Sequence, residues 1–486
     1  MRTVVDMSGR ALRLDSRSFR SLIVGAGLCW SIAFPIIALS CQLELYGDGA
    51  MFSYAVAVRD VWAFHWHNIS GRTSVFLLTL LPAEALVGVS GNPWAGIILY
   101  GLLFYLCPLA GLALTYAADR SLGRLIFVYA CGSTALLCPL LFGFPTEMWL
   151  AHAIFWPALA LGHYAKPTVT GALLVFIAWL LLAFTHEGAL VLLLAIVATL
   201  APRGLRSTAF VRAAISLMII MVLAAAAKIV APPDEYYADA FLRAALHFFD
   251  PGIFKVEVVL VLMATVTAYG AILMLLSRWL PRWACLCALG LLSGLLSIYW
   301  LHFDHSVHAS SRYYLRTALV IVTPLLGILA ALAAMARDGI ILDRPTRLRL
   351  VLVSPPGRMR CALASLFLVV TMIHTVETAK FVASWSNYRN AIAELAMSTE
   401  SDPALGNPRF VSAERISPAL APLSWFSTIP YLSVILSNFS PNRLVIDPTG
   451  NYFWLSCETA ARNRDAELAV PVQTRELVRI YSCLHR

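Results

Sequence analysis

Long apolar runs separated by short polar segments organise this chain. A helix that crosses roughly 30 Å of hydrocarbon needs about 17 to 25 apolar residues. Such runs predict eleven membrane-spanning helices, of which the fifth and sixth are short: Leu22–Cys41, Trp94–Ala117, Leu125–Phe144, Trp149–Tyr164, Val169–Thr185, Ala189–Ala201, Val211–Ala231, Val256–Leu276, Trp283–Leu301, Leu315–Ala336 and Cys361–Val376. The pattern therefore predicts an all-α polytopic membrane bundle.

The composition supports this class. Hydrophobic residues make up 60% of the chain and charged residues only 13%, with a mean hydropathy of +0.76. These values exclude an ordinary soluble enzyme. The formal charge of +9 comes from Lys and Arg residues in small groups between apolar runs. That distribution follows the positive-inside rule of membrane topology, so we expect a lipid bilayer and no nucleic acid as partner.

The loop charges predict an orientation. With the N-terminus inside, the basic groups fall in inner loops, whereas Asp48, Glu147 and Glu187 fall in outer loops. This assignment requires that Ser74–Val89 does not span, and Pro82 and Glu84 interrupt that run. We therefore expect Ser74–Val89 to lie in the outer interface, within a first outer loop covering residues 42–93.

Charged and turn-forming residues return from Lys380 onward. We therefore divide the chain into a membrane domain, residues 1–379, and a small soluble α+β domain on the outer face, residues 380–486. In this tail we predict three strands, Phe410–Val411, Tyr431–Leu436 and Leu444–Ile446. We also predict one helix, Thr474–Ile480.

Cysteines suggest one disulfide candidate. Cys457 and Cys483 are the two cysteines of the tail, and in an oxidising compartment they could be bonded, although sequence alone does not show that they meet. Most of the other cysteines stand singly inside apolar runs, where we expect them to pack as small hydrophobic side chains.

Asp48 is the first candidate for chemistry. It stands between Gly47 and Gly49 at the start of a polar stretch that ends at Arg72. One interpretation is an ordinary turn in which the aspartate caps the following helix. The other is a carboxylate at the membrane surface that acts as general base on an incoming hydroxyl. The two roles are compatible.

A polar turn between two short spans is the second candidate. His186 and Glu187 could bind a divalent metal ion or hold a phosphate by hydrogen bonds, or they could be a satisfied polar turn. His305 is a further candidate ligand, in a segment where interfacial histidines are also common. Two ligands are too few to assign a metal, so a divalent ion remains an open alternative as cofactor.

Arginines form the third candidate. Arg312, followed by Tyr313, could grip a lipid phosphate through two parallel hydrogen bonds, because a fixed guanidinium matches that geometry. Arg72 is the alternative for this role. Either arginine could instead be an interfacial anchor whose side chain reaches the lipid headgroups.

Taken together, the topology resembles the GT-C superfamily of integral-membrane glycosyltransferases. The resemblance lies in an inside N-terminus, a large first outer loop opening with Asp48, about eleven spans and an outer C-terminal domain. It implies that Asp48 is the catalytic base and that the donor is a polyprenyl-phosphate-linked sugar. It further implies a glycan or lipid acceptor, on the periplasmic side of a bacterial inner (plasma) membrane. The chain departs from better-known members by showing Gly47-Asp48-Gly49 where many show adjacent acids.

Two other functions remain open. A transporter or flippase would need ionisable residues near the bilayer midplane and paired repeats. The predicted spans are nearly free of mid-helix charge and show no repeat, which favours the enzyme. A polymerase or ligase of lipid-linked glycans shares the donor chemistry, and the sequence does not separate it from the transferase.

Overall fold

The computed structural model describes most of the chain. The described residues are 15–59, 61, 72–137, 146–230, 257–280, 283–304, 311–341, 355–399, 410–425, 428–439 and 442–446, without the side chains of 311–317 and 410.

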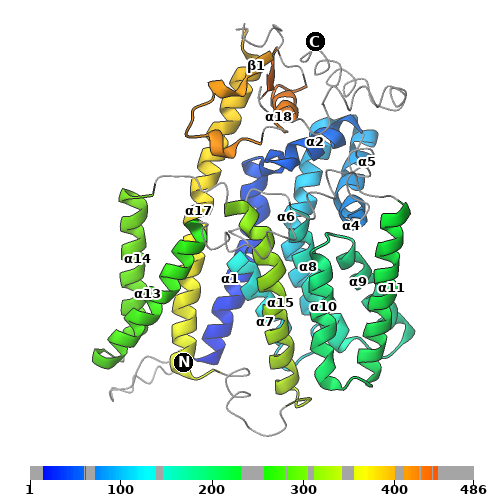
Figure 1. Ribbon diagram of the computed structural model, residues 1–486, viewed down its shortest axis with the longest axis vertical. Coiled ribbons are helices and arrows are strands. Elements are labelled where there is room, and N and C mark those ends of the chain that lie inside the picture. Colours follow the sequence, from blue (N-terminus) through cyan, green and yellow to red (C-terminus); the bar gives the residue numbers. More distant parts are fainter. Residues whose placement is uncertain are drawn as a thin grey trace.

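A bundle of helices forms the body of the molecule (Figure 1). Its helices are α1 (Ser16–Ser40), α6 (Pro93–Ala118), α7 (Leu125–Leu137), α8 (Glu147–Tyr164), α9 (Val169–Ala183), α10 (Ala189–Leu200) continued by η4 (Ala201–Arg203), α11 (Thr208–Val230), α13 (Glu257–Trp279), α14 (Ala284–His302), α15 (Ser311–Arg337) and α17 (Gly357–Met397). Wherever it is described, every predicted span is therefore helical except at one or two end residues, such as Phe184 and Thr185 after α9. An apolar run inside a membrane forms a helix because a helix satisfies the hydrogen bonds of its own backbone groups.

Within the described residues, eight helices are long and apolar enough to cross a membrane. One of the eight is Thr73–Ser90, which we predicted to lie in the interface. It comprises α4 (Thr73–Val75), the π-helical turn η2 (Phe76–Leu80) and α5 (Leu81–Ser90). In Figure 1, α5 lies beside α2 (Asp48–Val58), on the opposite side of the bundle from α13 and α14. The membrane class is thus supported, whereas the number eleven and the orientation stay predictions.

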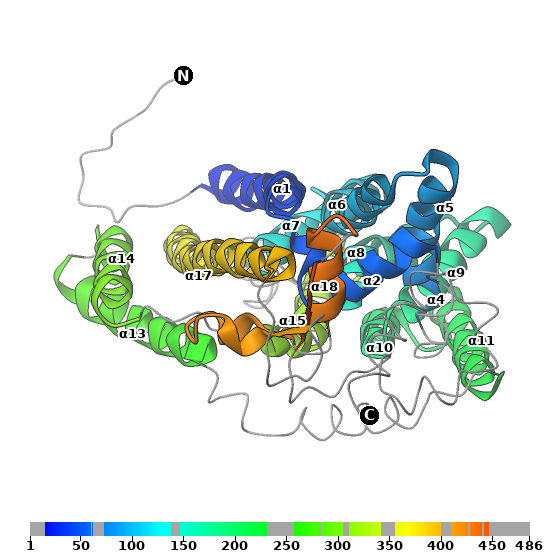
Figure 2. The same ribbon diagram turned by 90° about the horizontal axis from the view of Figure 1, so that it is seen from above.

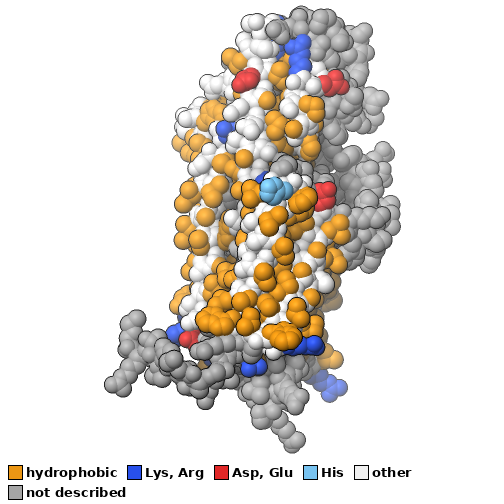
Figure 3. Space-filling model, turned by 90° about the vertical axis from the view of Figure 1, so that its left-hand side faces the viewer, with side chains coloured by type: hydrophobic (Ala, Val, Ile, Leu, Met, Phe, Trp, Pro, Cys, Tyr) orange, Lys and Arg blue, Asp and Glu red, His pale blue; other side chains and the backbone are white. Residues whose placement is uncertain are grey.

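The side of the molecule on which α14 lies has the surface expected in a bilayer. Figure 3 shows hydrophobic side chains over the middle of this face and Lys and Arg side chains at its lower rim. Exposed leucines and isoleucines on the described helices, such as Leu291, Leu295 and Ile298 of α14, are 52%, 56% and 52% exposed. Such a band is stable against lipid tails and would be unfavourable in water.

Small residues bring the central helices close together. A Cβ atom at Gly27 of α1 would lie 2.5 Å from the carbonyl oxygen of Cys131 in α7, and one at Gly111 of α6 would lie 2.4 Å from that of Ala153 in α8. Glycines at these positions let the backbones touch, as is common for helices packed in membranes.

The α13 and α14 hairpin stands to one side of the bundle, next to α17 (Figure 2). It has its own apolar cluster, in which Tyr269 and Leu292 pack with Val369 and Ile373 of α17. The Tyr269 hydroxyl donates to the carbonyl oxygen of Ala362 at 2.9 Å.

The tail begins without a break in α17. The proposed boundary at residue 380 falls inside this 41-residue helix. Lys380 donates to Asp304 at 3.0 Å and lies 3.4 Å from Glu377, so charged residues that end the apolar run do not end the helix. Trp385 and Tyr388 are buried, 1% and 2% exposed. The Trp385 ring lies 5.2 Å from that of Tyr46, and its Nε1 donates to the carbonyl oxygen of Cys41 at 3.0 Å.

Beyond α17, two short strands pair in parallel. They are β1 (Phe410–Ser412) and β2 (Leu444–Ile446), which confirms the predicted strand positions there. The predicted strand Tyr431–Leu436 is wrong, because this stretch belongs to helix α18 (Ile429–Leu436). Parallel strands need a crossover connection, and α18 supplies it. A short run that is apolar on every side does not distinguish a buried helix from a strand.

The remaining short elements connect these parts. They are three 3₁₀ turns: η1 (Leu43–Leu45), η7 (Ala413–Arg415) and η8 (Ala421–Leu423). Helix α18 packs on α17 and on α2, where the rings of Tyr54 and Tyr431 lie 5.2 Å apart. The predicted helix Thr474–Ile480, Cys457 and Cys483 lie outside the described residues.

Candidate functional site

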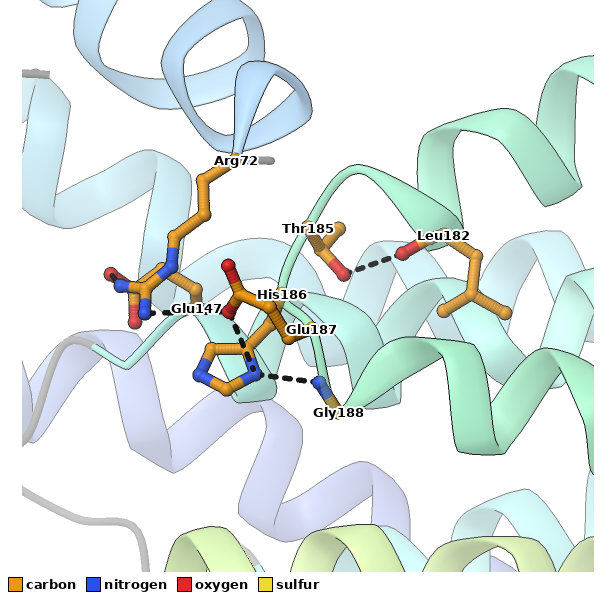
Figure 4. A network of polar contacts seen from close by, with 7 residues as sticks. All are labelled: Arg72, Glu147, Leu182, Thr185, His186, Glu187 and Gly188. Atoms are coloured by element: carbon orange, nitrogen blue, oxygen red, sulfur yellow. Dashed lines mark hydrogen bonds and ion pairs between the residues drawn. The ribbon is translucent and has the colours of Figure 1, made fainter. Parts of the chain in front are cut away.

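Arg72 lies at the centre of a buried polar cluster. It precedes α4, whose Ser74 amide donates to the carbonyl oxygen of Phe184 at 3.0 Å and so ties α4 to the end of α9. The arginine is 8% exposed. Figure 4 shows its side chain reaching from α4 towards the first turn of α8 and the turn between α9 and α10.

Two carboxylates flank the Arg72 guanidinium. Nη1 donates to Oε1 of Glu147, the first residue of α8, in a short contact. Nη2 lies 3.7 Å from Oε2 of Glu187 in the turn between α9 and α10. Both acids are about as buried as the arginine, with side-chain exposures of 8% and 11%. Two carboxylates thus share the Arg72 guanidinium.

His186 is held as a neutral imidazole beside this cluster. Its Nδ1 accepts a hydrogen bond from the Gly188 amide at 3.0 Å, so the ring proton is on Nε2. The same Nδ1 lies 3.8 Å from Oε2 of Glu187. The Thr185 hydroxyl donates to the carbonyl oxygen of Leu182 at 2.7 Å and closes the turn. The turn is therefore a well-satisfied polar structure that presents Glu187 to Arg72 (Figure 4).

Asp48 occupies the first position of α2, and the helix cap is Gly47. The backbone of Gly47 has φ 58° and ψ −134°, a conformation that residues with a side chain avoid, which explains the glycine before the acid. The Asp48 carboxylate lies in the first turn, where the helix dipole stabilises its charge, and it is partly exposed. The expectation that Asp48 itself caps the helix is therefore wrong.

Tyr100 connects Asp48 with the arginine cluster. It lies on α6 and is 1% exposed, and its hydroxyl is within electrostatic range of Glu147, Asp48 and Glu44. The sequence interpretation did not single out Tyr100, because a tyrosine in an apolar run is typical of any spanning helix. The structure thus brings Asp48 into the same neighbourhood as Glu147, which bonds to Arg72.

Glu44 is a buried acid that the sequence interpretation missed. It lies in η1, is 1% exposed and packs on α6, where a Cβ atom at Gly101 would lie 3.0 Å from its Cβ. Among the described residues, its Oε2 has no hydrogen-bond partner. Burial raises the pKa of the carboxyl to about 8, with the charge of Arg389 acting in the opposite direction. Glu44 is therefore mostly protonated at neutral pH.

An apolar groove starts where the polar cluster ends. It lies between α10 and α15, and its cavity volume is about 420 Å³. The lining residues are all apolar: Val191, Leu194, Ala195, Ala198, Val320, Ile321, Pro324, Leu325 and Ile328. A Cβ atom at Gly188 would lie 2.8 Å from the side chain of Val320 and 3.3 Å from Nδ1 of His186. The groove and the His186 turn therefore share one wall.

The described residues do not fit a resident metal ion. Among them, no group of three or more His, Cys, Asp and Glu side chains is arranged as metal ligands. The Nδ1 atom of His186 already accepts from a backbone amide, and Glu187 faces Arg72. His305 and the side chains of Arg312 and Tyr313 lie outside the described residues.

These features define the class of the molecule as an α-helical membrane protein with a buried charged cluster at one end of an apolar groove. No protein-family model and no curated protein sequence matches the chain. The site itself is therefore the basis for a function.

Proposed function

We propose that this chain is a membrane glycosyltransferase that moves a sugar from a polyprenyl-phosphate-linked donor to a glycan or lipid acceptor. One observation carries this proposal. At the His186 turn, a cluster of acidic side chains lies directly next to an apolar groove. A lipid-linked substrate has the same construction, with a charged and hydroxylated head on a long hydrocarbon chain. Groove residues Leu194 and Leu325 are 53% and 55% exposed, which suits them to such a chain.

Asp48 is the proposed general base. It takes the proton of the acceptor hydroxyl, whose oxygen then forms a bond to the anomeric carbon of the sugar. The bond from that carbon to the phosphate oxygen breaks, and the polyprenyl phosphate leaves with the electron pair. Asp48 suits this role because it is partly exposed, whereas Glu147 and Glu187 are buried against Arg72.

The contacts of Arg72 support a positioning role in place of the phosphate-binding role that the sequence suggested. Its guanidinium already faces two carboxylates, so its charge is already paired within the protein. Arg72 fixes Glu147, whose charge acts on Tyr100, the residue on which the charge of Asp48 also acts. Arg312 and Tyr313 stay the candidates for the donor phosphate. The distribution of loop charges supports a site on the outer face of the membrane, and a periplasmic location in a bacterial inner membrane is part of the proposal.

An assay of transfer in membranes tests the proposal. Asp48→Asn is compared with the unmodified chain in vesicles supplied with a panel of undecaprenyl-phosphate-linked sugars and extracted lipid and glycan acceptors. We expect product formation to fall at least about 100-fold, because a general base contributes that much or more. The exposed Glu394→Gln variant is the matched control and should keep its activity.

Two results would overturn the proposal. One is unchanged transfer by Asp48→Asn with a normal melting temperature. The other is movement of the labelled donor across sealed vesicles without any transfer, which would assign the chain to transport instead.

A further inference from the structure

Two arginines meet at the end of the bundle where α1 begins and α15 ends, the lower end in Figure 1. They converge on Gly123, in the loop between α6 and α7. A Cβ atom at Gly123 would lie 3.0 Å and 3.1 Å from the two terminal nitrogens of Arg20 and 3.3 Å from Cζ of Arg337. The two guanidinium groups are therefore no more than about 6 Å apart, close enough to repel strongly.

The acids of this region are already used. Asp119 accepts hydrogen bonds from the amide of Ser121 in its own loop at 2.9 Å and from that of Phe127 in the first turn of α7 at 3.0 Å. Asp338 accepts from the Leu122 amide at 2.9 Å and from the Tyr164 hydroxyl at 2.6 Å. Within the described part of the chain, neither of the two arginines forms an ion pair with a carboxylate. Among the described residues, no carboxylate neutralises their charges.

Partial burial makes this arrangement unfavourable without an anion. Both arginines are of intermediate exposure, and Arg20 experiences both desolvation and the charge of Arg337. Gly123, at φ 79°, keeps the space between them open, because any side chain there would touch both groups. A guanidinium offers paired donors that match the oxygens of a phosphate.

We propose that Arg20 and Arg337 form a binding site for a phosphate group. The group can come from an anionic lipid headgroup of the leaflet at this end of the helices or from a free phosphate compound. The two arginines lie at the ends of membrane helices, where basic side chains attract anionic lipids. This location favours a lipid headgroup as the source of the phosphate. This site is separate from Asp48 and does not depend on the proposed transferase activity.

Lipid binding to the full-length chain tests the site. The protein is placed in phosphatidylcholine nanodiscs with increasing phosphatidylglycerol, and retained lipid is counted by native mass spectrometry after release. We expect Arg20→Gln/Arg337→Gln to bind phosphatidylglycerol at least about tenfold more weakly, since one charge-assisted hydrogen bond is worth about that factor. The variant Arg20→Lys/Arg337→Lys keeps both charges and loses the paired guanidinium donors. Its affinity for phosphatidylglycerol should lie between those of the unmodified chain and the double glutamine variant. Arg206→Gln removes an exposed basic charge from another loop and should change nothing.

Inorganic phosphate distinguishes the two sources. If phosphate competes with phosphatidylglycerol at millimolar concentration, a soluble phosphate compound is the ligand, and if it does not, the lipid headgroup is. A second readout uses pure phosphatidylcholine, in which the double glutamine variant should melt no lower than the unmodified chain because its repulsion is gone. Equal retention of phosphatidylglycerol by the unmodified chain and the double glutamine variant would overturn the proposal.

Discussion

Replacing the buried acid Glu44 by glutamine should change how stability depends on pH. In the folded chain the carboxyl is 1% exposed, and burial raises its pKa from 4.5 to about 8. The groups that face it are Arg389 of α17 and the hydroxyls of Tyr100 and Tyr105 of α6. Glutamine has nearly the same shape and stays uncharged at every pH.

The sign follows from proton binding. Between pH 4.5 and about 8 the folded state holds the Glu44 proton and the unfolded state has released it, so the free energy of unfolding falls as the pH rises. The slope is about 1.4 kcal/mol per pH unit, which amounts to about 5 kcal/mol over the whole interval. Below pH 4.5 both states are protonated, and above about pH 8 both are ionised, so the effect is constant outside the interval.

Melting curves of the detergent-solubilised chain between pH 4 and pH 9 measure this effect. We expect the melting temperature of Glu44→Gln, relative to that of the unmodified chain, to rise steadily through the interval and then level off. The exposed acid Glu394, replaced in the same way, should give a flat difference. A flat difference for Glu44→Gln as well would refute the argument that this carboxyl is protonated in the folded protein.

Other predictions concern the arginine cluster and the close helix contacts. Arg72→Ala should lower the free energy of unfolding by about 3 to 5 kcal/mol, because it leaves two buried carboxylates together. Adding Glu147→Gln should restore part of that loss, and additive losses in the melting assay would contradict the pairing. Gly111→Val should prevent α6 from packing on α8, since its Cβ would lie 2.4 Å from the carbonyl oxygen of Ala153. Gly290→Val, with nothing within 4 Å, should leave the monomer peak in gel filtration unchanged.

Helix positions could be predicted from hydropathy because an apolar segment inside a membrane has to be helical. The apolar run Trp94–Ala117, for example, differs from α6 by one residue at each end. The predicted end of the last helix was wrong, because residues beyond it are buried by protein and not by lipid. Helix α17 continues far past Val376, and there Trp385 is buried against Cys41 and Tyr46. A search for lipid-facing residues does not detect this kind of burial.

The site could be predicted only in part. The glycines around Asp48 and the short turn at His186 are local signals, and both lead to polar groups in the structure. The partners of Arg72 come from α8 and from the turn before α10, and no local pattern indicates which acid faces which arginine. Glu147 was recognised only as an outer polar residue, and Glu44 was not recognised because its burial arises from packing on α6.

Helix α17 also has a mechanical consequence. At 1.5 Å per residue its 41 residues make a rod about 60 Å long, roughly twice the hydrocarbon thickness. A tilt of about 5° would move one end of such a rod by about 5 Å relative to the other. The α13 and α14 hairpin contacts α17 from Ala362 to Glu377, and α18, which also packs on α2, lies beside the upper part of α17 in Figure 1. A change in bilayer thickness around the hairpin would therefore be passed along α17 to α18 and to α2, the helix that begins with Asp48. Under the proposed transferase function, we expect turnover to vary with the acyl-chain length of the surrounding lipid.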